Sequence, residues 1–176
     1  MAKGFFYLVK SDAKRYENNL SVLRFIRLLV IHTGFQLVLF IRLQHLLGSI
    51  PVAGKILRRV LYYLSNIIFG CDINVKVFFK EGLYIPHPVG IVIGDGVSLG
   101  KNVSILQNVT IGRAKSGEHT APQIADNVQI SAGAVVVGNI TVGENSVIGA
   151  NAVVTKNIPA NRIAVGVPAR ILDKKA

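Results

Sequence analysis

The sequence contains no tryptophan, a single cysteine and only nine acidic residues among 176. Cys71 alone cannot form a disulfide framework, so we expect a protein of a reducing compartment, the cytoplasm. The first ten residues carry Lys3 and Lys10 around a short apolar stretch without a small-residue cleavage site, which is not typical of a secretory signal. With 51% hydrophobic residues, the chain is too apolar to be disordered.

Long apolar runs are also missing. The longest candidate, residues 28–41 (LLVIHTGFQLVLFI), has 14 residues and is bracketed by Arg24, Arg27 and Arg42. A helix that spans a bilayer needs about 20 apolar residues, so we do not expect this run to span one. We expect a helix buried at an interface between subunits. The alternative is a peripheral contact of the basic N-terminal helices with the inner face of the membrane.

Acidic residues are scarcest in the N-terminal part. Residues 1–70 contain ten Lys or Arg against Asp12 and Glu17, which gives this part most of the chain's net charge of +11. Such a surface can attract nucleic acid, anionic lipid or a phosphate-bearing substrate. We expect no nucleic-acid partner, because the basic residues are scattered among aliphatic ones and no nucleic-acid-binding motif is present.

The hydrophobic period changes near Gly70. Before it, apolar residues recur at helical spacing over residues 23–47, a stop signal follows at 48–51 (GSIP), and residues 57–68 are typical of another helix. We therefore expect an N-terminal α-helical region over residues 1–69 and a second domain over residues 70–172.

A six-residue period takes over after Gly70. Every first position from Ile93 to Ile111 and from Ile124 to Val154 is Ile, Leu or Val, and the fifth positions are nearly all small or aliphatic. Three such hexads form one triangular coil, in which the first positions stack as an apolar ladder while Gly or Asn occupies the tight turns. A β-sandwich would instead show strands every 8–12 residues. The expected fold is mainly β, a parallel β-helix.

The six-residue period is interrupted once. Ile124 follows Ile111 by 13 residues instead of 12, and residues 113–122 (RAKSGEHTAP) contain no ladder residue. We interpret this segment as a polar loop that replaces one turn and carries the substrate-loop candidates Lys115, Glu118 and His119, because loops on a rigid solenoid tend to carry function. A tolerated surface insertion is the alternative.

The hexads, residues 85–93 (IPHPVGIVI) and residues 164–171 (AVGVPARI) resemble hexapeptide-repeat acetyltransferases, in particular the serine O-acetyltransferase-like branch. The resemblance covers about residues 35–172. It implies a left-handed β-helix, a homotrimer or a dimer of trimers, and acetyl-CoA bound in a groove between neighbouring subunits.

Acetyl transfer to a hydroxyl needs a base to remove its proton, and a histidine oriented by a carboxylate suits this role. His32 and His45 lie in the expected helical region, where we expect core or interface positions. The resemblance implies that His87 is the catalytic base and that Asp72 orients it. An 18-residue coil would place the two near each other on adjacent turns. A surface histidine and a strand cap are the alternative.

The resemblance also implies a groove for acetyl-CoA lined by Ala132, Ala150, Thr155, Lys156 and Arg170. The two basic residues would neutralise phosphate charge, although ordinary surface basicity is the alternative. We expect no metal, because the histidines are dispersed and the cysteine is alone.

Three positions depart from the serine-specific members of the branch. Those enzymes have an Asp immediately before the catalytic His and an Arg-His pair in the loop, where this sequence has Pro86, Thr120 and Ala121. A serine zwitterion left without charged partners binds poorly. We therefore expect a sugar hydroxyl as acceptor, in a capsule, exopolysaccharide or other glycan pathway. A serine O-acetyltransferase of cysteine biosynthesis and a non-catalytic structural β-helix are the alternatives.

Overall fold

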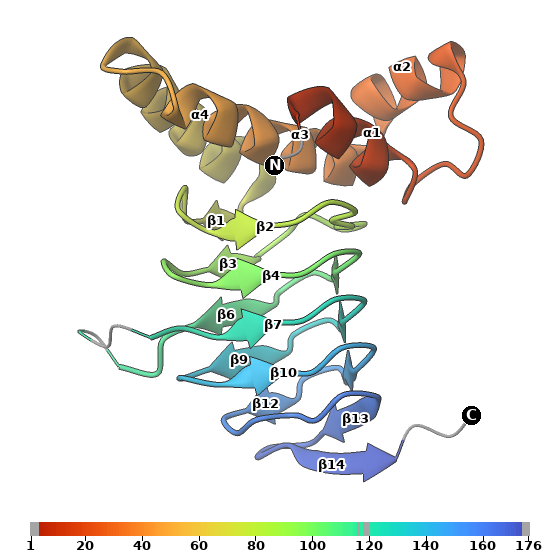
Figure 1. The fold of residues 1–176 in the computed structure, drawn as a ribbon, viewed down its shortest axis with the longest axis vertical. Helices are drawn as coiled ribbons and strands as arrows, with labels where there is room; N and C mark the ends of the chain where they lie inside the picture. Colours follow the sequence, from red (N-terminus) through yellow and green to blue (C-terminus); the bar gives the residue numbers. More distant parts are fainter. Residues whose placement is uncertain (1–3, 116, 118–119, 174–176) are drawn as a thin grey trace.

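Helices cap one end of a β-helix in the computed structural model, which describes residues 4–115, 117 and 120–173 (Figure 1). The helices are α1 (Phe5–Ala13), α2 (Val22–Ile31), α3 (Thr33–Gly48) and α4 (Ala53–Phe69). The last helix ends at Gly70, whose φ of 61° is left-handed and suits a residue without a side chain. The change of hydrophobic period at Gly70 is therefore a helix C-terminus.

The apolar run expected to form one helix is divided between α2 and α3. The two helices are bent by 92° where the chain passes His32, which has extended backbone angles. Within the described ranges, no single helix is long and apolar enough to cross a membrane, and only the bent pair of α2 and α3 reaches the required length and composition.

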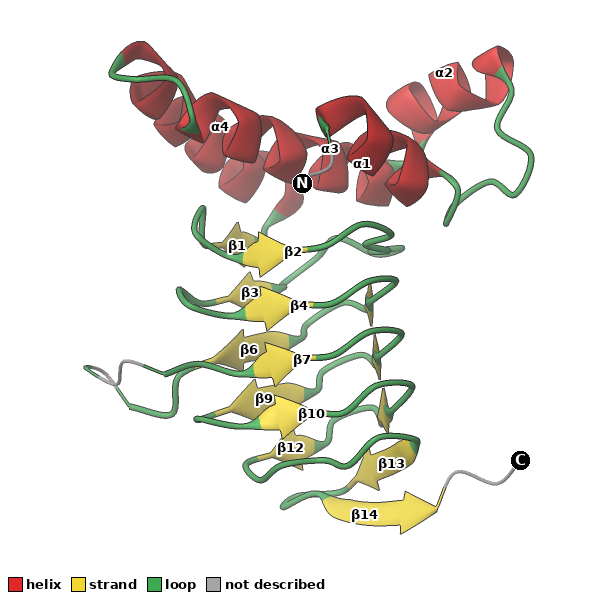
Figure 2. Cartoon of the chain, viewed as in Figure 1, coloured by secondary structure: helices red, strands yellow, loops and turns green. Residues whose placement is uncertain are grey.

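Short parallel strands build the rest of the described chain, and Figure 2 shows them stacked in successive coils. The strands are β1 (Asp72–Ile73), β2 (Phe78–Phe79), β3 (Val92–Ile93), β4 (Ser98–Leu99), β5 (Ser104–Ile105), β6 (Thr110–Gly112), β7 (Gln123–Ile124), β8 (Gln129–Ile130), β9 (Val135–Val137), β10 (Thr141–Val142), β11 (Val147–Ile148), β12 (Val153–Val154), β13 (Arg162–Val165) and β14 (Arg170–Asp173). They form three sheets, which we call A (β1-β3-β6-β9-β12), B (β2-β4-β7-β10) and C (β5-β8-β11-β13-β14). Among the strands of the described residues, only β14 runs antiparallel to its neighbour, β13. The expected left-handed parallel β-helix is confirmed.

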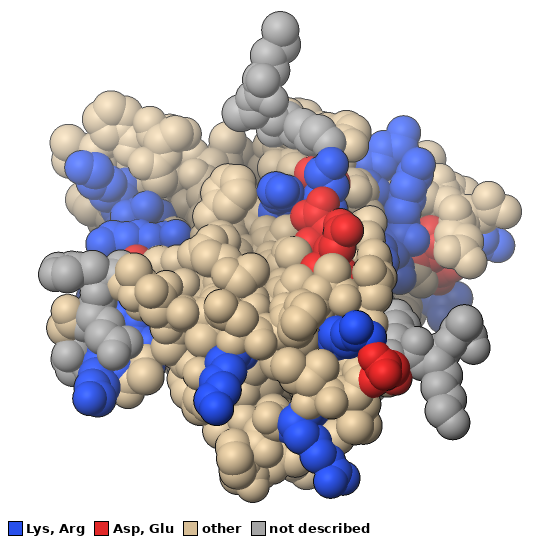
Figure 3. Space-filling model, turned by 60° about the horizontal axis from the view of Figure 1, so that its bottom comes forward, with Lys and Arg blue, Asp and Glu red and all other residues tan. Residues whose placement is uncertain are grey.

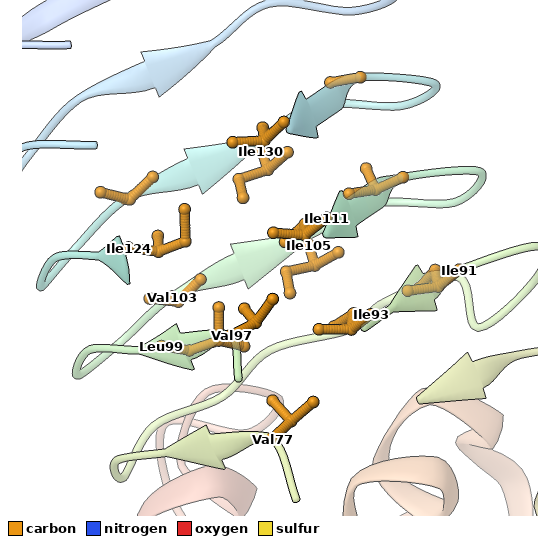
Figure 4. Close-up of a cluster of buried hydrophobic side chains, with 14 of the residues drawn as sticks. Val77, Ile91, Ile93, Val97, Leu99, Val103, Ile105, Ile111, Ile124 and Ile130 are labelled. Carbon is orange, nitrogen blue, oxygen red and sulfur yellow. The ribbon is translucent and has the colours of Figure 1, made fainter. Parts of the chain in front are cut away.

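The predicted ladder residues form the core. The first positions from Ile93 to Val154 and the fifth positions from Val97 to Ile158 are all buried, including Ser146. Figure 4 shows side chains from successive coils stacked inside the triangle of sheets. Because each hexad contributes one strand, the six-residue period directly encodes the three-sided cross-section.

Asparagines hold the tight turns between sheets B and C. Asn102, Asn127, Asn145 and Asn161 all adopt positive φ, between 54° and 60°. Their side chains form a ladder, with Asn102 Nδ2 donating to Asn127 Oδ1 at 3.1 Å and the same pattern repeated in the next two coils. The asparagines thus supply both the left-handed backbone and hydrogen bonds between coils.

The polar loop does not replace a turn, which corrects the sequence-based interpretation. The chain passes directly from β6 in sheet A to β7 in sheet B, so the coil keeps all three sides. Gln123 pairs with Ser98, 25 positions earlier, whereas Thr141 pairs with Gln123 after 18. Seven residues are therefore inserted at one corner. An insertion of seven shifts the hexad phase by one, which explains the spacing of 13 in the sequence.

A buried ion pair docks the helices onto the first coil. Arg42 of α3 donates to Asp12 of α1 from Nε at 2.7 Å and from Nη2 at 3.0 Å. The same guanidinium donates to two backbone carbonyls at the end of β2, at 3.1 and 2.7 Å. The Asp12 carboxylate accepts from the backbone N–H groups of Gly82 and Leu83 at 2.8 and 2.9 Å. Burial raises the pKa of Asp12, and these donors oppose that rise.

His45 of α3 is half-buried, and its ring lies 4.8 Å from that of Phe79. The pKa of His45 is lowered from 6.5 to about 4. Burial is the main cause, and repulsion from Arg42 and Arg58 adds to it. As the pH falls, the unfolded chain takes up a proton near pH 6.5, whereas the folded protein resists protonation until about pH 4. The stabilisation is complete above pH 6.5 and is lost as the pH falls toward 4.

We predict that the free energy of unfolding decreases by roughly 2–3 kcal/mol through His45 between pH 7 and pH 4. Denaturant titrations of the wild type and of His45→Gln at both pH values measure this contribution, because glutamine does not titrate. An equal loss of stability in the two proteins would contradict the assignment to His45.

Candidate functional site

His87 stands on a widened corner between sheets C and A. Tyr84 bridges to Ser104 and Val92 pairs with Thr110, so this corner spans eight residues where the next coil uses six. Two additional residues therefore lie in the segment that contains His87, whose side chain is exposed in the described chain. The first coil accordingly has 20 residues rather than the expected 18, since Asp72 pairs with Val92.

The helical layer holds this corner at Ile85, two residues before His87. The Tyr16 hydroxyl accepts from the Ile85 N–H at 3.0 Å and donates to the Ile85 carbonyl at 3.1 Å. Gly34, at the start of α3, approaches so closely that an added Cβ would lie 1.8 Å from the same carbonyl oxygen. The expected catalytic histidine thus follows a rigid segment, and the sequence gives no local signal for this support.

Asp72 opens β1 and is exposed. Its backbone N–H donates to the Ile91 carbonyl at 2.8 Å, and its Oδ1 accepts from the Tyr62 hydroxyl of α4 at 2.6 Å. Among the residues that the structure describes, no hydrogen bond or ion pair joins Asp72 to His87. Both residues flank the same corner, because the Gly90 N–H donates to the Gly70 carbonyl at 3.0 Å. Their pairing as base and orienting carboxylate stays a prediction.

Two predicted groove residues lie on the same edge as His87. Backbone hydrogen bonds connect this edge from coil to coil, from Asn108 to Val89, from Gly133 to Gln107 and from Asn151 to Ala132, each at 2.9 Å. Ala132 is therefore on the sheet C–sheet A edge, and Ala150, next to Asn151, is one coil further. Neither carries a side chain that would obstruct an extended ligand along this edge.

The other predicted groove residues lie near the C-terminal end. Thr155 and Lys156 follow β12 and line a cavity of about 140 Å³ together with residues of the segment 168–171. Arg170, the first residue of β14, is exposed beside this cavity. Figure 3 views the molecule from this end and shows Lys and Arg side chains spread over the visible face. Ala132 and Ala150 thus lie on one edge of sheet A, and Thr155 and Lys156 lie on the opposite edge.

The polar loop projects from the sheet A–sheet B edge (Figure 1). Lys115 is exposed, whereas Glu118 and His119 lie outside the described residues. Arg113, at the start of the loop, has its Nη2 3.7 Å from the Asp95 carboxylate. Ala121, at the end of the loop, is buried in the core. Sequence analysis did not identify Arg113 or Tyr62 as candidate site residues. Each is close to an acidic side chain only in the folded protein, Arg113 to Asp95 and Tyr62 to Asp72.

Across the described ranges, no group of three His, Cys, Asp or Glu side chains is arranged to hold a metal ion.

Known proteins resemble this chain both in the repeat and over nearly its whole length. The family model "Bacterial transferase hexapeptide (six repeats)" matches residues 121–156. A serine acetyltransferase of Synechococcus elongatus is 35% identical over 150 residues, which cover 84% of this chain and 60% of that protein. A serine acetyltransferase of Bacillus pumilus is 30% identical over 179 residues, which cover 96% of this chain and 77% of that protein.

The chain is also similar to solved structures of serine acetyltransferases. Serine acetyltransferase from Brucella abortus in complex with coenzyme A matches with a TM-score of 0.85 and 34% identity, covering 98% of this chain and 69% of that one. Serine acetyltransferase from Neisseria gonorrhoeae in complex with serine matches with a TM-score of 0.83 and 34% identity, covering 96% of this chain and 69% of that one.

The chain spans 60% of the relative from Synechococcus elongatus and 51% of a serine acetyltransferase of Escherichia coli, so these two contain parts that have no counterpart here. The matches to solved structures nevertheless cover 96–98% of this chain, so they include both the helical cap and the coils. At these identities and coverages, the likeness extends beyond the architecture that any hexapeptide repeat would produce. The chain therefore belongs to the serine acetyltransferase family of hexapeptide-repeat transferases.

Proposed function

We propose that the protein transfers the acetyl group of acetyl-CoA to a hydroxyl group, with His87 as the general base. The observation that carries this proposal is the exposed His87 on a widened, helix-supported corner, at one end of an edge that continues past Ala132 and Ala150. The relative from Brucella abortus, whose structure is a complex with coenzyme A, supports the choice of donor.

The proposed reaction uses one proton relay. The imidazole of His87 removes the proton of the acceptor hydroxyl as its oxygen attacks the thioester carbonyl. The new C–O bond forms, the C–S bond breaks, and the imidazolium returns the proton to the departing thiolate. Asp72 would fix the histidine tautomer and stabilise the imidazolium. Lys156 and Arg170 are the proposed partners of the CoA phosphates.

L-Serine is the first acceptor to consider, because the relatives are serine acetyltransferases and one was solved with serine. These relatives support the serine alternative from the sequence analysis better than the sugar hydroxyl that we expected. Lys115, exposed in the loop, is a cation available to a substrate carboxylate, whereas Arg113 is already close to Asp95.

A sugar hydroxyl is the second candidate, and residues of the His87 corner and of the polar loop favour it. Pro86 precedes His87 and offers no carboxylate for an amino group. Ala121 is buried and has no polar atom in its side chain. Thr120 is exposed but uncharged. An ammonium or carboxylate group that loses its hydration without gaining a charged partner costs several kcal/mol.

An acceptor panel separates these candidates. We predict that purified protein releases CoA from acetyl-CoA when a hydroxyl acceptor is added. The kcat/KM for serine should differ from that for nucleotide-linked or free sugars by at least about 10²-fold, because a site with charged partners for a zwitterion leaves them unpaired when a sugar binds. Thiol release and mass spectrometry of the product measure the reaction. Failure to bind CoA and to acetylate any hydroxyl would favour a structural β-helix.

A homotrimer, or a dimer of trimers, is the proposed assembly. Within one chain, His87, Ala132 and Ala150 lie on one edge of sheet A, while Lys156 and the polar loop lie on the other. A groove for acetyl-CoA between two chains would bring the His87 edge of one copy to face the Lys156 edge of a second copy. Light scattering during size-exclusion chromatography measures the mass of the assembly.

The helical cap is the proposed place of further subunit contacts. Several large apolar side chains of α2 and α4 are exposed in the described chain, among them Leu23, Val30, Val60 and Ile67. We assign these faces to contacts between subunits, with peripheral membrane binding as the competing outcome, and we place the protein in the cytoplasm. The division into a helical region, 1–69, and a transferase domain, 70–172, is likewise proposed.

A further inference from the structure

Tyr62 connects the helical cap to the proposed site. Its hydroxyl donates to Oδ1 of Asp72 at 2.6 Å, which is short for a hydrogen bond and typical of one between a hydroxyl and a carboxylate. No other side chain in the described part of the structure donates to the Asp72 carboxylate, so its second oxygen is available. The backbone of Asp72 is fixed by the sheet, since its N–H donates to Ile91.

The surroundings of Tyr62 keep its hydroxyl in the role of donor. The hydrogen bond to Asp72 raises the pKa of Tyr62, so the phenol stays protonated over the physiological range. The Arg59 guanidinium lies 5.8 Å from the Tyr62 ring and the Tyr63 ring lies 5.7 Å away. Asn66, one helical turn further along α4, opposes this rise in the pKa of Tyr62.

We propose that Tyr62 is a positioning residue of the acetyl-transfer site, which holds the Asp72 carboxylate by one oxygen and leaves the other to orient His87. This inference rests on the proposed function. Without the hydrogen bond from Tyr62, the Asp72 carboxylate would rotate more freely. It would also carry more negative charge on the oxygen that we assign to His87. The first effect lowers kcat, and the second stabilises the imidazolium and raises the pH at which the base becomes active.

The test compares Tyr62→Phe with Tyr63→Phe. Tyr63 is the adjacent tyrosine, is 52% exposed and receives a hydrogen bond from Arg59 rather than contacting Asp72. We expect Tyr62→Phe to lower kcat about 10-fold with little change in KM for acetyl-CoA. The acidic limb of its kcat/KM profile should move to higher pH by roughly 0.3–1 unit. Tyr63→Phe should match the wild type in both measurements.

A double-mutant cycle with Asp72→Ala tests whether Tyr62 acts through Asp72. Once the carboxylate is absent, the additional Tyr62→Phe change should have no further effect on kcat. Additive losses, or an unchanged pH profile in Tyr62→Phe, would overturn the positioning role while leaving acetyl transfer by His87 intact.

A second readout does not depend on turnover. In ¹³C-tyrosine NMR titrations, Asp72→Ala should lower the pKa of Tyr62 toward the ordinary value of tyrosine. An unchanged Tyr62 titration would refute the contact itself. If the wild type acetylates no acceptor, the proposed function fails and the positioning role fails with it, whereas the NMR result still decides whether the hydrogen bond exists.

Discussion

Replacement of His87 by alanine should lower kcat for acetyl transfer by about 10²- to 10⁴-fold and leave the affinity for CoA unchanged. The reason is that an alcohol at neutral pH is a poor nucleophile until a base removes its proton. His87 is exposed on its corner, so its truncation leaves no cavity in the core. The loss should therefore appear in the chemical step, measured by thiol release at saturating substrates, together with CoA affinity by calorimetry.

Lys101→Ala provides the control for this experiment. Lys101 lies at the corner between sheets B and C, away from the His87 edge, and its Nζ is 3.9 Å from the Glu81 carboxylate at the surface. Its kcat should equal that of the wild type. A His87→Ala protein that retains wild-type circular dichroism, CoA affinity and kcat would exclude His87 as the base.

Replacement of Asp12 by alanine should lower the free energy of unfolding by about 3–5 kcal/mol, because Arg42 would remain buried without a counter-ion. The Asp12 side chain is fully buried and only 2% of the Arg42 side chain is exposed. The variant also deprives the Gly82 and Leu83 N–H groups of their acceptor. Denaturant titrations followed by circular dichroism measure the change.

Two comparisons show whether the effect comes from the buried charge. The double variant Asp12→Leu with Arg42→Met should be less destabilised than Asp12→Ala alone, since both charges are then removed together. Lys101→Ala, which removes a surface ion pair, should cost at most about 1 kcal/mol. A loss of similar size in Asp12→Ala and Lys101→Ala would contradict the structural role of the buried pair.

Much of the β-helix could be predicted from the sequence because its signal is local and repeated. Each hexad encodes one strand and one turn, and the ladder positions from Ile93 to Val154 were identified without knowledge of any contact. The helical region was harder to predict. Its apolar residues indicate helices but not the bend of 92° between α2 and α3, which follows from packing rather than from a sequence motif.

The polar loop shows the limit of a period-based interpretation. A spacing of 13 can arise from a missing turn or from seven inserted residues, and the two leave the same phase shift in the sequence. Only strand pairing distinguishes them, and the pairing of Gln123 with Ser98 shows that no side of the coil is lost. The insertion therefore extends a corner without interrupting the core.

The sequence by itself determined the three-sided solenoid and the change of structure at Gly70, because each depends on residues close together in the chain. His87 is the candidate base through the resemblance to a known family, and this role stays a prediction. Tertiary structure alone decided which edges of sheet A carry the candidate residues and which side chain reaches Asp72. Tyr62 contacts that carboxylate at 2.6 Å although α4 and β1 are different elements. Such contacts depend on how the helical cap sits on the first coil, and the buried pair of Asp12 and Arg42 fixes that arrangement through residues 30 positions apart.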